Sequence, residues 1–147
     1  MKIKVLVVED HPATRLGLVM LLEREDDIEV VGEAENGAEA LQKIRELQPD
    51  IVLLDLRLPD MPGERVAVEI RQTGLDTKVI AFSAYVDEEH VMGMLNAGAL
   101  GYILKTEPPK TIVKAIRTVA EQEPWLSRSA LEVVRTSDGA SCPSPRP

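Results

Sequence analysis

The sequence contains few of the residues on which several kinds of site depend. Cys142 is the only cysteine among 147 residues, which excludes an internal disulfide and a cysteine zinc cluster. The aromatic residues are Phe82, Tyr85, Tyr102 and Trp125, too few for a stacking platform that binds single-stranded nucleic acid. No apolar run approaches the length of a membrane span, and the N-terminus has no signal-peptide layout. We therefore expect a cytoplasmic protein with no membrane partner.

Basic residues are also in the minority. The chain has 17 Lys and Arg against 25 Asp and Glu, which gives a formal net charge of −8. Binding to a phosphate backbone relies on basic side chains, so this chain is a poor candidate for contacting DNA by itself. Its length suits one domain with an ordinary core and a short tail.

Apolar segments typical of strands alternate five times with segments of helical periodicity. The predicted strands cover residues 3–8, 28–32, 51–55, 78–82 and 101–104. Several are continuous runs of Val, Ile and Leu, as in strands buried on both faces. This order and spacing are typical of βαβ units and predict an α/β fold, a parallel sheet with helices on both faces.

Two of the predicted helices carry specific expectations. In the first, Leu16, Val19 and Met20 lie at helical spacing, and we expect them to face the core. The second begins with a capping box, in which Asn36 accepts a hydrogen bond from the backbone of Glu39 while the Glu39 side chain reaches back.

The composition changes after residue 123. We expect a domain over residues 1–123, then a short extra helix and the start of a linker over 124–135, with Ser127 as the helix cap. Residues 136–147 are rich in Pro and Ser and predict a flexible linker. A linker at the end of the chain indicates that a C-terminal module is missing.

Polar residues follow the predicted strands at their carboxyl ends. These are Glu9 and Asp10 after the first strand, Asp55 after the third, Ser83 after the fourth and Lys105 after the fifth. In a parallel sheet all of these ends share one edge. If the strand order is 2-1-3-4-5, as in flavodoxin-like doubly wound folds, the first and third strands are neighbours and the three carboxylates converge.

This combination of groups suits phosphoryl transfer. Three close carboxylates repel one another unless a cation neutralises them, and an all-oxygen site with few protein ligands favours Mg²⁺ over Ca²⁺. Lys105 and Ser83 could each contact a phosphoryl oxygen, while Asp55 accepts the group. Each residue alone is more often a cap, a turn residue or a surface charge, but their joint arrangement favours a site. His11 and His90 have no paired nucleophile, and we expect both to be solvated.

Four motifs, at residues 7–12, 53–59 with Gly63, 82–84 and 98–105, resemble the receiver (phosphoacceptor) domain of bacterial two-component response regulators. The resemblance covers about residues 3–121. Residues 30–41 and the His11-Pro12 pair resemble in particular the LuxR/NarL/FixJ-type branch, whose members carry a C-terminal helix-turn-helix.

The resemblance implies a role for each residue of the predicted site. Asp55 would accept a phosphoryl group from a sensor histidine kinase, as an acyl phosphate. Asp10, Asp55 and the backbone carbonyl of Arg57 would hold Mg²⁺, and Glu9, which replaces the commoner Asp, would act through water. Lys105 would pair with the phosphoryl group.

The resemblance also implies how the switch works. Ser83 would move toward the phosphate and Tyr102 would turn inward with it, which changes the surface used for signalling. Arg57 and Tyr85 occupy positions that in the family flank the path of the attacking water. The expected protein is a transcriptional switch that can form a homodimer on phosphorylation and reaches DNA only through the missing module. It would not be an enzyme beyond its own phosphorylation and dephosphorylation.

Three alternatives remain open at this point. One is a stand-alone receiver that acts in a phosphorelay or by protein contact. Another is an aspartyl-phosphate phosphatase of the dehalogenase type, which needs a second Asp where Arg57 stands in this chain. The third is an atypical receiver that works unphosphorylated, and the complete set of acids and Lys105 argues against it.

Overall fold

The structure is a computed structural model that describes residues 2–141, with side chains described up to residue 136. Its centre is a six-stranded sheet in the order β2-β1-β3-β4-β5-β6, with all neighbouring strands parallel. The strands are β1 (Ile3–Val8), β2 (Ile28–Ala34), β3 (Ile51–Asp55), β4 (Lys78–Ser83), β5 (Gly101–Leu104) and β6 (Trp125–Leu126). The predicted doubly wound fold and the order 2-1-3-4-5 are confirmed, and β6 is an addition beyond β5.

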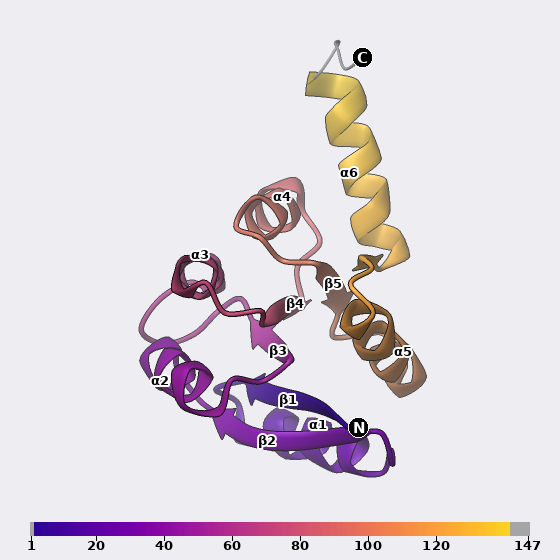
Figure 1. Cartoon of the computed structure of the whole chain (residues 1–147). Coiled ribbons are helices and arrows are strands. Elements are labelled where there is room, and N and C mark those ends of the chain that lie inside the picture. Colours follow the sequence, from indigo (N-terminus) through magenta and orange to yellow (C-terminus); the bar gives the residue numbers. More distant parts are fainter. Residues whose placement is uncertain (1, 142–147) are drawn as a thin grey trace.

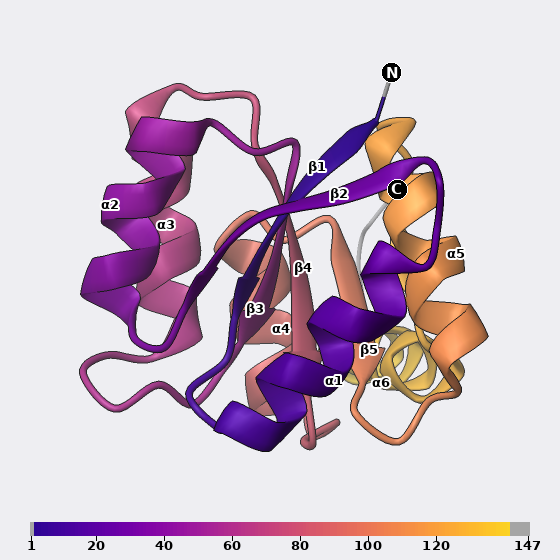
Figure 2. The same cartoon turned by 90° about the horizontal axis from the view of Figure 1, so that it is seen from below.

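The helices cover both faces of the sheet (Figures 1 and 2). They are α1 (Pro12–Glu23), α2 (Gly37–Leu47), α3 (Gly63–Thr73), α4 (Glu88–Asn96), α5 (Pro109–Ala120) and α6 (Arg128–Ser141). Helices α2, α3 and α4 lie on one face, and α1 and α5 lie on the other. The order of neighbouring strands reverses between β1 and β3, which is where such folds place their ligand sites.

Each central strand contributes to two separate cores because successive side chains point to opposite faces. The side chains that face α2, α3 and α4 include Leu6, Val8, Val52 and Leu54. Those that face α1 and α5 include Val5, Val7, Ile51 and Leu53. All of these residues are buried, which explains why the strands are continuous apolar runs rather than alternating ones.

The orientation of α1 differs from the prediction. Leu16 and Met20 are 60% and 55% exposed, whereas Leu18 and Leu22 are buried against the sheet. Val19 is half-buried and packs at the edge of the same core. Because residues 18–22 are all apolar, the sequence contains two overlapping apolar stripes, and the stripe through Leu16 and Met20 was the wrong one.

The predicted cap of α2 is confirmed. The backbone N–H of Glu39 donates to Asn36 Oδ1 at 2.8 Å. The Glu39 side chain does reach back, but its Oε1 accepts from the backbone N–H of Glu35 at 3.0 Å, one residue before Asn36. The Asn36 side chain therefore satisfies one of the N–H donors that the first turn of the helix leaves without a partner.

A residue from the β3–α3 loop also caps α2. The Asp60 carboxylate accepts from the backbone N–H groups of Gly37 at 2.7 Å and Ala38 at 2.9 Å. Hydrogen bonds between a carboxylate and the first amides of a helix are favourable because the helix dipole is positive there. This contact fastens the loop that follows Asp55 to a neighbouring helix.

The segment after residue 123 is part of the fold rather than the start of a linker. β6 pairs with β5, and α6 packs against α4, with Ala130 fully buried. Ser127 caps α6 as predicted, since its Oγ accepts from the backbone N–H of Ala130 at 3.2 Å. The helix continues to Ser141, so residues 136–141 of the predicted linker are helical. The rest of that linker, residues 142–147, lies outside the described residues.

Candidate phosphorylation site

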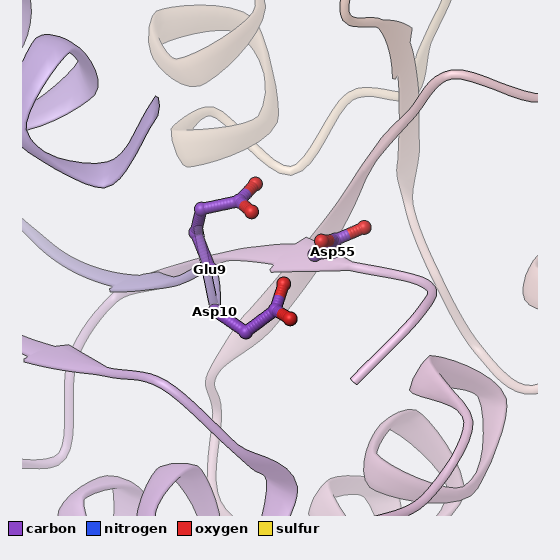
Figure 3. A group of neighbouring side chains, drawn as sticks. All are labelled: Glu9, Asp10 and Asp55. Atoms are coloured by element: carbon purple, nitrogen blue, oxygen red, sulfur yellow. The ribbon is translucent and has the colours of Figure 1, made fainter. Parts of the chain in front are cut away.

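Three carboxylates gather at the carboxyl ends of β1 and β3, as predicted. Glu9 and Asp10 directly follow β1, and Asp55 is the last residue of the neighbouring strand β3. One oxygen from each lies within 4.8 Å of the others (Figure 3). This all-oxygen set, with one exposed member and two buried ones, fits a hard divalent cation such as Mg²⁺ that keeps some of its waters.

Lys105, directly after β5, also contacts this group. Its Nζ lies 2.9 Å from Glu9 Oε1 and 3.3 Å from Asp55 Oδ2. Glu9 is almost fully buried, and its other oxygen accepts from the backbone N–H of His11 at 3.0 Å. Glu9 therefore contacts Lys105 directly, a partnership that the sequence did not predict, because the longer arm of Glu carries its carboxylate to the ammonium.

The charges in the group perturb one another. Burial and then the negative charge of Glu9 raise the pKa of Asp55, and the nearby Lys105 ammonium only partly opposes them. Burial by itself lowers the pKa of Lys105, but its hydrogen bond to Glu9 and the charge of Asp55 outweigh that effect and raise it. A carboxyl group with a raised pKa next to a fixed cation is typical of functional sites.

The two residues of the predicted switch meet at the backbone of Tyr85. Ser83 is buried at the end of β4, and its Oγ accepts from the Tyr85 N–H at 2.9 Å. Tyr102 points inward with no exposed surface, and its hydroxyl donates to the Tyr85 carbonyl at 2.5 Å. Burial raises the pKa of Tyr102, and its contact with the Ser83 hydroxyl opposes the shift. The structure thus brings Ser83 and Tyr102 together through a third residue.

Arg57 lies between Asp55 and Tyr85. Its backbone N–H donates to Asp55 Oδ1 at 3.3 Å, and its guanidinium donates to the Tyr85 hydroxyl at 2.5 Å. The guanidinium carbon is also 4.9 Å from the centre of the Tyr85 ring. Arg57 and Tyr85 therefore connect the β3–α3 and β4–α4 loops, which flank Asp55.

The two histidines differ from each other. The His11 ring is exposed and has one long contact, 3.5 Å from the Thr14 hydroxyl. His90 is partly solvated, with its side chain 32% exposed, but its ring also stacks on Tyr85 and its Nδ1 contacts Asp87. The sequence carried a signal for the contact with Asp87, which is the cap of α4 and stands three residues before His90, but none for the stacking on Tyr85.

The comparison with known sequences decides the family. Residues 5–117 match the family model described as response regulator receiver domain. The chain belongs to this family. It is 40% identical over 124 residues to the transcriptional regulatory protein LiaR of Bacillus subtilis, covering 84% of this chain and 59% of LiaR. It is 38% identical over 126 residues to the oxygen regulatory protein NreC of Staphylococcus epidermidis, covering 84% of this chain and 57% of NreC. The chain thus spans less than two thirds of these relatives.

Solved structures agree with this assignment. A two-component response regulator of the LuxR family from Aurantimonas sp. superposes with a TM-score of 0.89 at 29% identity, covering 95% of this chain and 99% of that chain. The receiver domain of a response regulator NarL from Mycobacterium tuberculosis gives 0.79 at 41% identity, covering 82% and 97%. The predicted family and its LuxR/NarL branch are confirmed. Within residues 2–141, no helix combines the length and apolar character needed to cross a membrane.

Proposed function

We propose that this chain is the phosphorylation-controlled switch of a two-component system, with Asp55 as the residue that accepts the phosphoryl group. One observation carries the proposal. The Asp55 carboxylate lies at the edge of the sheet within 4.8 Å of carboxylate oxygens from Glu9 and Asp10, and 3.3 Å from the Lys105 ammonium. An acceptor carboxylate, a cation-binding group and a fixed ammonium are the parts that transfer of a phosphoryl group requires.

Asp55 acts as the nucleophile in the proposed reaction. A carboxylate oxygen of Asp55 attacks the phosphorus of a phosphohistidine on the sensor kinase. A new O–P bond forms, the N–P bond breaks, and the kinase imidazole leaves. Asp10, Asp55 and the carbonyl of Arg57 would hold Mg²⁺, with Glu9 acting through water. When bound, the ion supplies positive charge that offsets the phosphoryl oxygens.

Lys105 and Ser83 contact the phosphoryl group after transfer. Lys105 already touches Asp55, so it can pair with a phosphoryl oxygen after a small movement away from Glu9. The Ser83 Oγ accepts from the Tyr85 N–H and also contacts the Tyr102 hydroxyl, so its hydroxyl hydrogen would turn from Tyr102 to donate to another phosphoryl oxygen. Tyr102, linked to the same backbone, carries the change to β5.

The partners in this proposal follow from the family. The phosphodonor is a sensor histidine kinase in the cytoplasm, phosphorylation promotes a homodimer, and the output is transcription through a C-terminal helix-turn-helix module. The named relatives are transcriptional and oxygen regulators, which supports the output. The acidic balance of this chain also argues that DNA contact belongs to another part of the protein.

A second candidate is a stand-alone receiver that acts in a phosphorelay or by protein contact. Sequencing the gene beyond codon 147 distinguishes the two. An in-frame helix-turn-helix would exclude the stand-alone receiver.

The proposed function is tested by phosphorylating the protein with acetyl phosphate and Mg²⁺ and measuring its intact mass. The native chain should gain one phosphoryl group, and Asp55→Asn should gain none. Asp76→Asn is the matched control, because the Asp76 side chain is 94% exposed and remote from the site in sequence, and it should be labelled like the native chain. Phosphate incorporation that persisted in Asp55→Asn would show that the proposal is wrong.

A further inference from the structure

Tyr85 is the point at which three parts of the site are joined. Its backbone N–H donates to Ser83, and its carbonyl accepts from Tyr102. Its ring and hydroxyl contact Arg57 on the opposite loop. A residue with this many contacts would be expected to be buried, yet Tyr85 is 36% exposed. Its ring is therefore held by neighbouring side chains rather than by burial in the core.

His90, in the first turn of α4, is one of these neighbours. The His90 and Tyr85 rings are stacked, with centroids 5.0 Å apart and planes inclined by 17°. This distance and tilt lie in the range in which aromatic pairs attract each other. The ring of His90 is held in turn, since its Nδ1 lies 2.7 Å and 2.9 Å from the two carboxylate oxygens of Asp87.

Asp87 anchors the arrangement to the backbone of α4. It is the N-cap of this helix, and its side chain accepts from the His90 backbone N–H as well as contacting the ring. The result is a continuous series of contacts, from Asp87 to His90, Tyr85 and Arg57. It begins at the end of a helix and ends two residues after Asp55.

We propose that His90 is a positioning residue of the phosphorylation switch, which keeps Tyr85 in contact with Arg57 and so slows hydrolysis of the aspartyl phosphate. This inference rests on the proposed function of Asp55. In hydrolysis, a water oxygen bonds to phosphorus, the bond from phosphorus to the Asp55 oxygen breaks, and both protons of the water leave with inorganic phosphate. The Asp55 carboxylate is regenerated.

Geometry connects His90 to this reaction. Asp55 is only 6% exposed, and the loops that carry Arg57 and Tyr85 follow β3 and β4, which pair at Asp55 and Phe82. Water approaches phosphorus on the side away from the Asp55 oxygen, which is the solvent side of this sheet edge. The contact between Arg57 and Tyr85 ties the two loops together there, and His90 limits how far Tyr85 can move.

Three variants of the full chain test the inference. His90→Ala removes the ring and its contact with Asp87, His90→Phe keeps a ring that can stack, and His90→Gln keeps a hydrogen-bonding side chain without a ring. Glu89→Gln is the matched control, an exposed neighbour in the same helical turn. Each protein is phosphorylated with acetyl phosphate and Mg²⁺, the donor is removed, and the phosphorylated fraction is followed by intact mass. Thermal melting of each variant accompanies the measurement.

The phosphate half-life of His90→Ala should be shorter than that of the native chain by about two- to tenfold, the range that an aromatic pair contributes beyond its buried area. His90→Phe should recover at least half of this loss, and Glu89→Gln should match the native chain. If His90→Ala does not fold, His90→Gln should give the same shortening.

Other outcomes overturn the inference. Equal half-lives in all variants, a longer half-life without the ring, or no recovery in His90→Phe would each show that stacking on Tyr85 does not control hydrolysis. Shortening in Glu89→Gln would show a general effect of α4. If the native chain takes up no phosphoryl group, the proposed function fails and this inference fails with it, whereas normal labelling with equal half-lives refutes only the role of His90.

Discussion

The ammonium of Lys105 lies closer to Glu9 than to Asp55, at 2.9 Å against 3.3 Å. Glu9 is therefore a second partner that competes for this cation. Both carboxylates are buried, and such ion pairs form only where geometry offsets the cost of removing charges from water. A phosphoryl group on Asp55 would add negative charge there, so the Lys105 ammonium would move from Glu9 toward Asp55.

Replacing Lys105 should separate phosphorylation from its consequences. Lys105→Ala should still be phosphorylated, because Asp55 and the cation-binding carboxylates remain, but the change at β5 should be lost. Trp125 is a natural probe, since it lies on β6 and pairs with Gly101 of β5. Beryllofluoride should alter Trp125 fluorescence in the native chain and in the exposed-lysine control Lys110→Ala, but not in Lys105→Ala. An unaltered response in Lys105→Ala would count against its role.

Mg²⁺ should stabilise the protein in a pH-dependent way. Binding to the folded state alone adds about 2.7 kcal/mol when free Mg²⁺ is about 100 times Kd. The pKa of Asp55 is raised in the folded state, so above that pKa the ionised carboxylate lowers the stability of the protein without Mg²⁺. This destabilisation disappears as the pH falls through the raised pKa and Asp55 is protonated. Protonated Asp55 cannot bind the ion, so stabilisation by Mg²⁺ should fade at a higher pH than for an ordinary carboxyl group.

Thermal melts with and without Mg²⁺ across a pH series measure this effect. Asp10→Asn is the informative comparison, because it removes one ligand from the exposed side of the group. It should keep the fold and lose most of the stabilisation by Mg²⁺. A full Mg²⁺ effect in this variant, or one that does not depend on pH, would contradict the assigned site.

Asp60 should stabilise the protein as the second cap of α2. Loss of a helix cap typically costs about 1 kcal/mol, and we expect this cost for Asp60→Ala by urea unfolding at neutral pH. Hydrogen bonds from the N–H groups of Gly37 and Ala38 lower the pKa of Asp60. Its contribution is therefore complete above the unfolded-state pKa and is lost as the pH falls through the lower folded-state pKa. If the difference in the free energy of unfolding between the native chain and Asp60→Ala were the same at every pH, the ionised carboxylate would not be the stabilising group.

Two glycines should respond in opposite ways to the same substitution. A Cβ on Gly63 would lie 2.8 Å from the Asp55 carbonyl oxygen and 2.9 Å from Leu56 Cα, both backbone atoms that cannot move freely. Gly63→Ala should therefore cost about 1–3 kcal/mol. Gly17, within α1, has no atom in the way, and Gly17→Ala should stabilise by about 0.5–1 kcal/mol. Urea unfolding of both variants checks the pair, and equal effects would refute the steric argument.

The strands and the acidic site could be predicted because they depend on local pattern. The runs that became β1, β3 and β5 have the predicted bounds, since continuous apolar segments between turn residues allow few other choices. Asp55, Ser83 and Lys105 lie at the same edge because any parallel sheet brings the carboxyl ends of its strands to one edge.

Other features depend on choices that the pattern leaves open. Helix α1 has two apolar stripes, and only their packing against β1 and β3 decides which one is buried. The sequence therefore could not show that Leu18 and Leu22, rather than Leu16 and Met20, face the core. β6 has only two residues, too few for a periodicity. The stacking of His90 on Tyr85 depends on the position of a helix relative to a loop, which no spacing in the sequence encodes.

The attachment of α6 has a mechanical consequence. The backbone N–H of Ser127 donates to the carbonyl of Tyr102 at 2.9 Å, and α6 begins at the next residue. The start of α6 is therefore joined to the backbone of Tyr102, the proposed switch residue, while the helix packs against α4. Its 14 residues are about 21 Å long. A tilt of the helix axis by about 10° about its first residue would therefore displace its last residue by about 4 Å. A displacement too small to rearrange the sheet would thus be amplified at the end of α6.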